Sequence, residues 1–229
     1  MKTKNNGNNL LELLSIEQPE TTAGMIKTQK QEMYVHQVFL DEDIGPPSKY
    51  RDLISMLYSS SEMDTFNLLI NSGGGEAAAA GSIIEAINCT EAHVRAVLLG
   101  DCHSAASMIA LNCDEVIVLE SSTMMIHTCT FGTAGNTHLV KGHVDFSAKI
   151  INNLLDRTYE GFLTNDELET VKKGQEIWLD CNDIEKRLES RFEYQKDKMK
   201  QIETAVKILP PIKKAKPEQA VKVAKKTTK

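Results

Sequence analysis

The stretch FNLLINSGGGEAAAAGSIIEAINCTEAHVRAVLL, residues 66–99, decides the fold class of this chain. It opens on a short apolar run, turns at three consecutive glycines, continues as an alanine-rich segment, and closes on a second apolar run. Short apolar runs bounded by turn residues predict buried strands, and the longer segment between them predicts a helix. Strand, helix and strand in this order favour parallel pairing with a right-handed crossover. The stretch therefore predicts an α/β fold.

The same alternation continues on both sides of this stretch, and the second half of the chain is mostly helical. Apolar spacing and turn signals predict strands at 34–40, 66–70, 94–99, 116–119 and 124–126, and helices at 50–57, 77–88, 140–162, from 164, and from 180 to about 206. A long charged helix attached to a compact α/β core usually packs on a neighbour. We therefore expect an oligomer.

Composition divides the chain into four expected segments. These are a flexible amino-terminal segment at 1–32, the α/β domain at 33–190, a helical extension at 191–209 and a disordered lysine-rich tail at 210–229. The tail interleaves no aromatic residues with its lysines, so a solvated or tethering role is favoured over nucleic-acid binding.

Cysteine usage and the lack of long apolar runs predict a cytoplasmic protein. The five cysteines are odd in number and form no C-x-x-C pair, which is typical of reduced thiols. We expect no signal or transit peptide, and no run approaches the ~20 apolar residues of a membrane helix. Cys102, His103 and Cys129 could ligate zinc, but their spacing is unlike known zinc sites, so we expect no metal and no cofactor.

Two turns rich in small residues follow successive predicted parallel strands, at 72–75 and 102–107. Ligand sites of open α/β sheets lie beyond the carboxyl ends of their strands. Glycines let a reacting carbonyl approach the backbone N–H groups closely, which suits an oxyanion hole. The run lacks the GKS or GKT ending of a phosphate-binding loop. A plain tight turn is the alternative interpretation.

Two serines compete as nucleophile in the second turn. Ser104 starts the predicted helix, where serine most often caps a free N–H, and we assign it that role. Ser107 lies one turn further on, flanked by Ala105, Ala106 and Met108, where no cap is needed and small neighbours leave room for a substrate. The sequence therefore favours Ser107 as the nucleophile.

His127 is the candidate general base, because it ends the apolar strand at 124–126, at the sheet edge where the two turns are expected. A serine and histidine pair also needs an acid to orient the imidazole. The sequence spacing leaves four candidates for this role open: Glu176, Asp180, Asp156 and Asp145.

Three blocks in this region closely resemble the signature blocks of the ClpP family, the proteolytic subunits of the Clp protease. They are Ile70–Gly75 followed by Ala80 and Gly81, then Ser104–Met108, then Met125–His127, and the resemblance covers about residues 34–190. It implies a ClpP/crotonase-like fold of repeated ββα units with a largely parallel sheet and a protruding helix, here with an extra helix at the carboxyl end.

The resemblance also implies an activity and partners. ClpP-like chains are serine endopeptidases that hydrolyse unfolded polypeptides inside a chamber formed by a ring, or by a stacked double ring, of identical subunits. Because the chain has no nucleotide-binding motif, any ATP dependence would come from a partner such as an AAA+ unfoldase.

By the same resemblance, each site residue has an implied role. Ser107 is the nucleophile, His127 the base and Glu176 the acid, with Asp180 as the fallback. The backbone N–H groups of Gly75 and Met108 form the oxyanion hole. Substrate binding as an extended strand is implied for Gly74, Glu76, Ala77, Thr130, Phe131 and Gly132.

Departures from the family pattern keep other functions open. Gln175 stands where the family usually has an arginine, and the resemblance ends past Leu188. These changes suit a divergent, phage-encoded member, such as a viral head-maturation protease or a catalytically weakened ring subunit. A crotonase-like acyl-CoA enzyme is disfavoured, because such enzymes usually place a carboxylate where this chain has serine and histidine.

Overall fold

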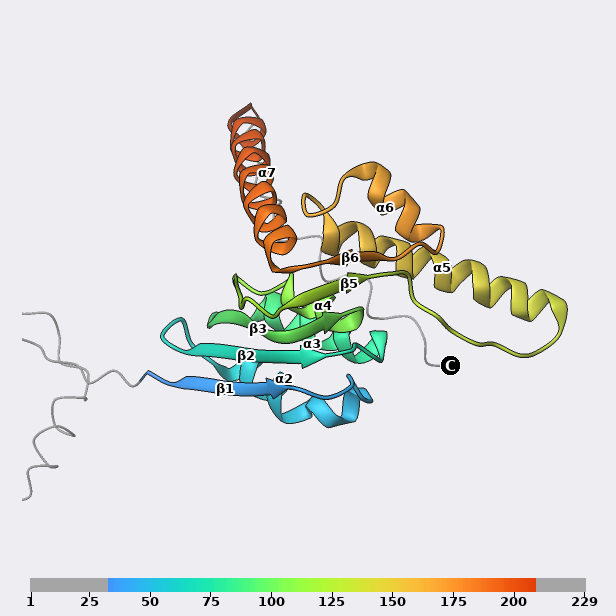
Figure 1. The fold of residues 1–229 in the computed structure, drawn as a ribbon, viewed down its shortest axis with the longest axis horizontal. Helices are drawn as coiled ribbons and strands as arrows, with labels where there is room; N and C mark the ends of the chain where they lie inside the picture. Colours follow the sequence, from blue (N-terminus) through green and yellow to red (C-terminus); the bar gives the residue numbers. More distant parts are fainter. Residues whose placement is uncertain (1–32, 209–229) are drawn as a thin grey trace, which may run out of the picture. The chain divides into compact units, whose positions relative to one another are not determined.

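The protein is described here from a computed structural model, which covers residues 33–208 (Figure 1). The predicted flexible segment at 1–32 and the predicted tail at 210–229 lie outside the described residues. The sequence predicted an α/β fold with a largely parallel sheet, and the structure confirms it.

The sheet has six strands in the order β1-β2-β3-β5-β6, and β4 pairs with the first half of β3. They are β1 (Val35–Leu40), β2 (Thr65–Ser72), β3 (His93–His103), β4 (Glu115–Val118), β5 (Thr123–Ile126) and β6 (Ile177–Leu179). All pairs are parallel except β5 with β6. Strands β2, β3 and β5 therefore end side by side.

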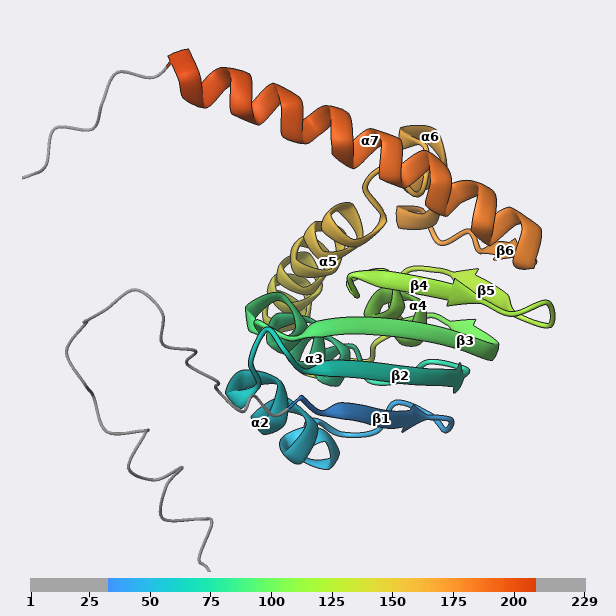
Figure 2. The ribbon, with the colours of Figure 1, turned by 90° about the vertical axis from the view of Figure 1, so that its left-hand side faces the viewer.

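Helices connect the strands along the chain, and the last helix follows the last strand. They are η1 (Pro47–Tyr50), α2 (Arg51–Ser59), α3 (Ala77–Cys89), α4 (Ala105–Ala110), α5 (Thr137–Tyr159), α6 (Asn165–Lys172) and α7 (Cys181–Ile208). Figure 2 shows α2 beside β1 and α3 beside β2 and β3, while α7 leads away from the sheet at β6. None of the described helices is long and apolar enough to cross a membrane.

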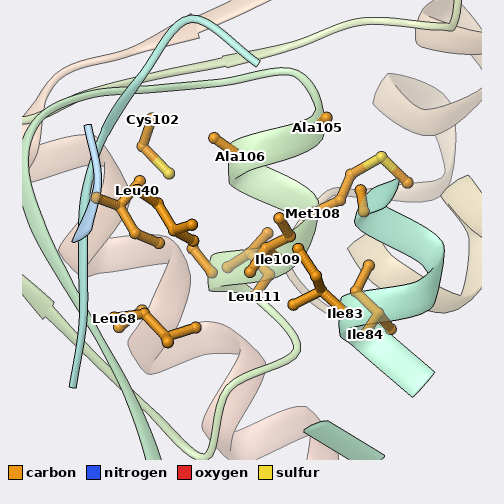
Figure 3. Close-up of a cluster of buried hydrophobic side chains, with 14 of the residues drawn as sticks. Leu40, Leu68, Ile83, Ile84, Cys102, Ala105, Ala106, Met108, Ile109 and Leu111 are labelled. Carbon is orange, nitrogen blue, oxygen red and sulfur yellow. The ribbon is translucent and has the colours of Figure 1, made fainter. Parts of the chain in front are cut away.

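The core lies between one face of the sheet and helices α3 and α4. Alternate residues of β2 point into it, and Phe66, Leu68 and Ile70 are fully buried. Every residue of α4 is buried, and Met108 and Ile109 lie beside Ile83 and Ile84 of α3 (Figure 3). The short helix that follows β3 is thus held rigidly against the body of the protein.

An ion pair ties α7 to α6. The Arg187 guanidinium donates two hydrogen bonds to the Glu167 carboxylate, at 2.6 and 3.0 Å. These bonds lower the pKa of Glu167 to about 2. Glu167 also closes a capping box with Thr164 at the start of α6, where the sequence predicted a helix from residue 164.

The strand predictions need two corrections. Strand β3 runs to His103 rather than ending near residue 99, because its second half finds a partner in β5. Strand β6, only three residues long, was not predicted. The predicted domain boundary at 190 lies within α7 and stays a prediction.

Candidate active site

The two predicted turns and the predicted histidine meet at one edge of the sheet. Ser72 of β2 pairs with Cys102 of β3, and His103 pairs with Met125 of β5. The residues that follow these strands therefore share one edge, as the parallel topology predicted.

Ser104 forms a strained turn between β3 and α4. Its φ and ψ are 53° and −120°, and it is the only non-glycine residue at positive φ among residues 33–208. Such a conformation costs on the order of 1–3 kcal/mol and persists only where surrounding contacts impose it. Here the Ser104 N–H donates to the Met125 carbonyl at 2.7 Å. A serine on a strained strand-to-helix turn presents its hydroxyl outward, as in a nucleophile elbow.

His127 pairs with Ser104. Its Nε2 lies 2.7 Å from Ser104 Oγ, and both residues are half-buried, so a substrate can reach the pair from solvent. The Ser104 side chain makes no capping hydrogen bond. The predicted capping role of Ser104 is therefore wrong, because the positive φ turns its hydroxyl to His127 rather than to the helix N–H groups.

Ser107, the predicted nucleophile, lies elsewhere. It is fully buried, and its Oγ lies 2.7 Å from both the Ser104 carbonyl oxygen and the hydroxyl of Tyr159 at the end of α5. Ser104 precedes the helix at positive φ, whereas Ser107 lies within α4, whose residues are all buried. The structure thus corrects the predicted pairing of Ser107 with His127.

The glycine turn presses against Ser104. Gly74 has φ 95°, and a methyl group on it would lie 2.7 Å from the His103 carbonyl and 3.1 Å from the Ala105 nitrogen. Gly75 has φ 145°, and a methyl group there would lie 2.2 Å from the Ile44 carbonyl oxygen. Both positions therefore require glycine.

Two backbone N–H groups at this edge are free to bind a ligand. Within residues 33–208, the N–H groups of Gly75 and Ala105 donate to no acceptor. The N–H of Met108 donates to the Ser104 carbonyl at 3.2 Å. The N–H of the predicted oxyanion donor Met108 is therefore already paired with a helical carbonyl in this structure, whereas those of Gly75 and Ala105 are not.

The candidate acids form other contacts. Glu176 accepts a hydrogen bond from the Trp178 indole at 3.0 Å, and Asp180 accepts one from the Asp183 N–H at 2.9 Å, which starts α7. Asp156 pairs with Lys172. Of the carboxylates that the structure describes, none forms an ion pair with His127.

The strand register favours Glu176 over Asp180 as the partner of His127. Strands β5 and β6 pair Met125 with Trp178 and Ile126 with Ile177. Continued by one residue beyond the paired strands, this antiparallel register would set Glu176 opposite His127, whereas Asp180 lies at the other end of β6.

A protein-family model matches most of the chain. The model of the Clp protease family matches residues 25–184, which include Ser104, His127 and Glu176. The chain belongs to the Clp protease family. The comparison with curated proteins gives no match. Membership in this protease family indicates a ClpP-like peptidase, and the part of α7 after residue 184 lies outside the match.

The predicted substrate-binding residues of this Clp protease family member lie on two segments. Gly74 and Glu76 bond through their backbones to Ile44, which already pairs with one side of the glycine turn. Ala77 begins α3. The segment with Thr130, Phe131 and Gly132 is exposed and has no regular structure, and the Phe131 ring contacts His143. Substrate binding between these segments stays a prediction.

Cysteine and metal chemistry find no support at this edge. Cys102 is fully buried, and burial raises the pKa of its thiol, which keeps it protonated. His103 bonds instead to Thr123, and no group of three metal-ligating side chains occurs in the part of the chain that the structure describes.

The sequence analysis assigned Ser104 to a helix cap and gave no role to Ala105 or Tyr159. The place of Ser104 directly after the strand was the available signal, because an elbow serine sits at the turn itself. The role of Tyr159 depends on how α5 packs, which no local pattern reveals.

Proposed function

We propose that this chain hydrolyses peptide bonds as a ClpP-type serine endopeptidase, with Ser104 as the nucleophile. The observation that carries the proposal is the distance of 2.7 Å between Ser104 Oγ and His127 Nε2, at a strained turn. Membership in the Clp protease family supports the reaction class.

The geometry suggests the order of proton transfers. His127 Nε2 accepts the Ser104 hydroxyl proton while Oγ attacks the carbonyl carbon of the peptide. The histidine then gives this proton to the leaving nitrogen, the C–N bond breaks, and an acyl-enzyme forms. Water then attacks the ester carbon while His127 accepts the water proton; the bond from this carbon to Ser104 Oγ breaks, and His127 returns the proton to Oγ.

The oxyanion hole is proposed at the N–H groups of Gly75 and Ala105. Ala105 directly follows the proposed nucleophile. Because Gly74 has no side chain, the space beside the Ala105 nitrogen is open. Neither N–H has an acceptor within residues 33–208. Donors that are already in place stabilise charge that appears only in the transition state.

Glu176 is proposed as the orienting acid. The sheet register supports this role, although its carboxylate bonds to the Trp178 indole in this structure. A rotation of the Glu176 side chain would exchange the indole for the imidazole.

We predict that Glu176→Gln lowers kcat at least tenfold, since an amide orients the imidazole less well than a carboxylate. Asp180→Asn is the matched control, because asparagine also caps a helix, and it should leave kcat within about twofold. Steady-state cleavage of a fluorogenic peptide measures both. Equal losses of kcat in the two variants, or a loss of kcat with Asp180→Asn alone, would show that Glu176 is not the orienting acid.

We further propose the setting of this peptidase. Copies of the chain form a ring, or a stacked double ring, in the cytoplasm and cleave unfolded polypeptides that an AAA+ unfoldase supplies. Family membership and the resemblance described above support these statements.

A fluorophosphonate probe tests the proposed chemistry. We expect covalent labelling of the wild-type protein, and fragment-ion sequencing of the labelled peptide should place the adduct on Ser104 rather than Ser107. An adduct on Ser107 would overturn the assignment. A complete lack of labelling in the assembled protein would favour the alternative of a catalytically weakened ring subunit.

A further inference from the structure

A buried chain of hydroxyl groups lies directly behind the proposed nucleophile. Tyr159 from α5 reaches Ser107 of α4, with 2.7 Å between the two oxygens, and Ser107 reaches the Ser104 carbonyl, again at 2.7 Å. Both Ser107 and Tyr159 are fully buried. Neither side chain forms a hydrogen bond with His127, so these two hydroxyl groups take no part in the proton transfers proposed above.

The direction of these hydrogen bonds follows from the number of protons. A serine hydroxyl has one proton, and Ser107 uses it toward the Ser104 carbonyl, which can only accept. Tyr159 must then donate to Ser107. Burial raises the pKa of Tyr159, which keeps this donor protonated.

The Ser104 carbonyl, which accepts the hydrogen bond from Ser107, belongs to the peptide unit that joins Ser104 to Ala105. This unit is planar and trans, so its carbonyl oxygen and its N–H point in opposite directions. A bond that fixes the Ser104 carbonyl therefore also fixes the direction of the Ala105 N–H. The helical bond from Met108 to the same carbonyl is longer, at 3.2 Å, and holds it less firmly than Ser107 does.

Serines within helices often bond to a carbonyl three or four residues earlier, with no role in function. Two features set Ser107 apart. The carbonyl that it holds belongs to a residue with φ 53°, where the backbone is strained and other peptide orientations compete. The second feature is the buried Tyr159 hydroxyl from another helix, which leaves Ser107 a single hydrogen-bond direction.

We propose that Ser107 and Tyr159 are positioning residues that lock the peptide unit between Ser104 and Ala105, so that the Ala105 N–H faces the developing oxyanion. This inference rests on the proposed role of Ser104 as the nucleophile. This lock, formed by the hydrogen bonds from Tyr159 to Ser107 and from Ser107 to the Ser104 carbonyl, helps the Ala105 N–H to stabilise the negative charge of the transition state. It does not affect substrate binding. Its loss therefore changes kcat and not KM.

Tyr159→Phe and Ser107→Ala test the lock in the full-length protein. We expect Tyr159→Phe to lower kcat for a short fluorogenic peptide about tenfold, and Ser107→Ala about thirtyfold, below the 10²–10³-fold cost of removing an oxyanion donor outright. KM should stay within about twofold. The inhibition constant of a peptide aldehyde, whose adduct places an oxyanion in the same site, should rise by the same factors as kcat falls.

Ser82→Ala is the matched control, because Ser82 of α3 also bonds to a helical carbonyl, that of Ala78 at 3.0 Å, but this carbonyl does not belong to the peptide unit between Ser104 and Ala105. It should leave kcat and aldehyde inhibition unchanged. Wild-type kcat in Tyr159→Phe, or a kcat loss without weaker aldehyde inhibition, overturns the lock. If Ser107→Ala does not fold, Tyr159→Phe alone decides. A wild-type protein without fluorophosphonate labelling would instead show that the proposed function has failed.

Discussion

Replacement of Ser104 by alanine is expected to lower kcat/KM for peptide hydrolysis by at least about 10⁴-fold, because no other hydroxyl reaches His127 Nε2 within the described residues. The neighbouring Ser107 cannot substitute for it, since its oxygen is buried and already bonded on two sides. Initial rates with a fluorogenic peptide, together with fluorophosphonate labelling, measure this loss.

Ser107→Ala is the decisive comparison, because the two serines are only three residues apart. We expect Ser107→Ala to remain labelled by the probe and to keep far more activity than Ser104→Ala. The melting temperature of Ser104→Ala should stay close to that of the wild type, because the change removes one half-buried hydroxyl. The reverse ranking of the two variants would return the nucleophile to Ser107.

The position of the site followed from the sequence, whereas the choice between the two serines did not. Parallel strands end at a shared edge, so the glycine turn, the turn after β3 and His127 had to meet once β2, β3 and β5 were neighbours. The nucleophile depends instead on the φ angle of a single residue. Serine at a helix start most often has a φ that suits capping, and the packing that forces Ser104 to 53° involves residues far along the chain.

The acid was equally hard to place, for a different reason. The register would set Glu176 opposite His127 only because β6 pairs antiparallel with β5, and β6 has three residues, too few for a periodic pattern to emerge. The resemblance to the ClpP family pointed to Glu176 where periodicity could not. Its present contact with Trp178 depends on side-chain rotamers, which no sequence pattern encodes.

Gly74→Ala is expected to damage both stability and activity. Alanine at φ 95° is strained, and its methyl group would lie 2.7 Å from the His103 carbonyl oxygen and from Ser104 Cβ. The turn cannot move aside, because the Gly74 carbonyl accepts from the Ile44 N–H at 2.7 Å and its own N–H donates to Ser72 Oγ. We expect a loss of about 3 kcal/mol of stability, which lowers Tm by about 6–12 °C, and kcat reduced at least about 100-fold.

Gly81→Ala is the matched control for this prediction. Gly81 lies within α3, a methyl group there would meet no atom within 4 Å, and alanine favours a helix over glycine by about 1 kcal/mol. Gly81→Ala should therefore keep wild-type kcat and raise Tm slightly. Since Ser104 Cβ is one of the atoms that the new methyl group would displace, peptide turnover below the melting temperature separates damage at the nucleophile from loss of fold. A Gly74→Ala protein as stable and active as Gly81→Ala would mean that the glycine turn does not pack closely against Ser104. The proposal that the Gly75 N–H on this turn is the second oxyanion donor would then lose its support.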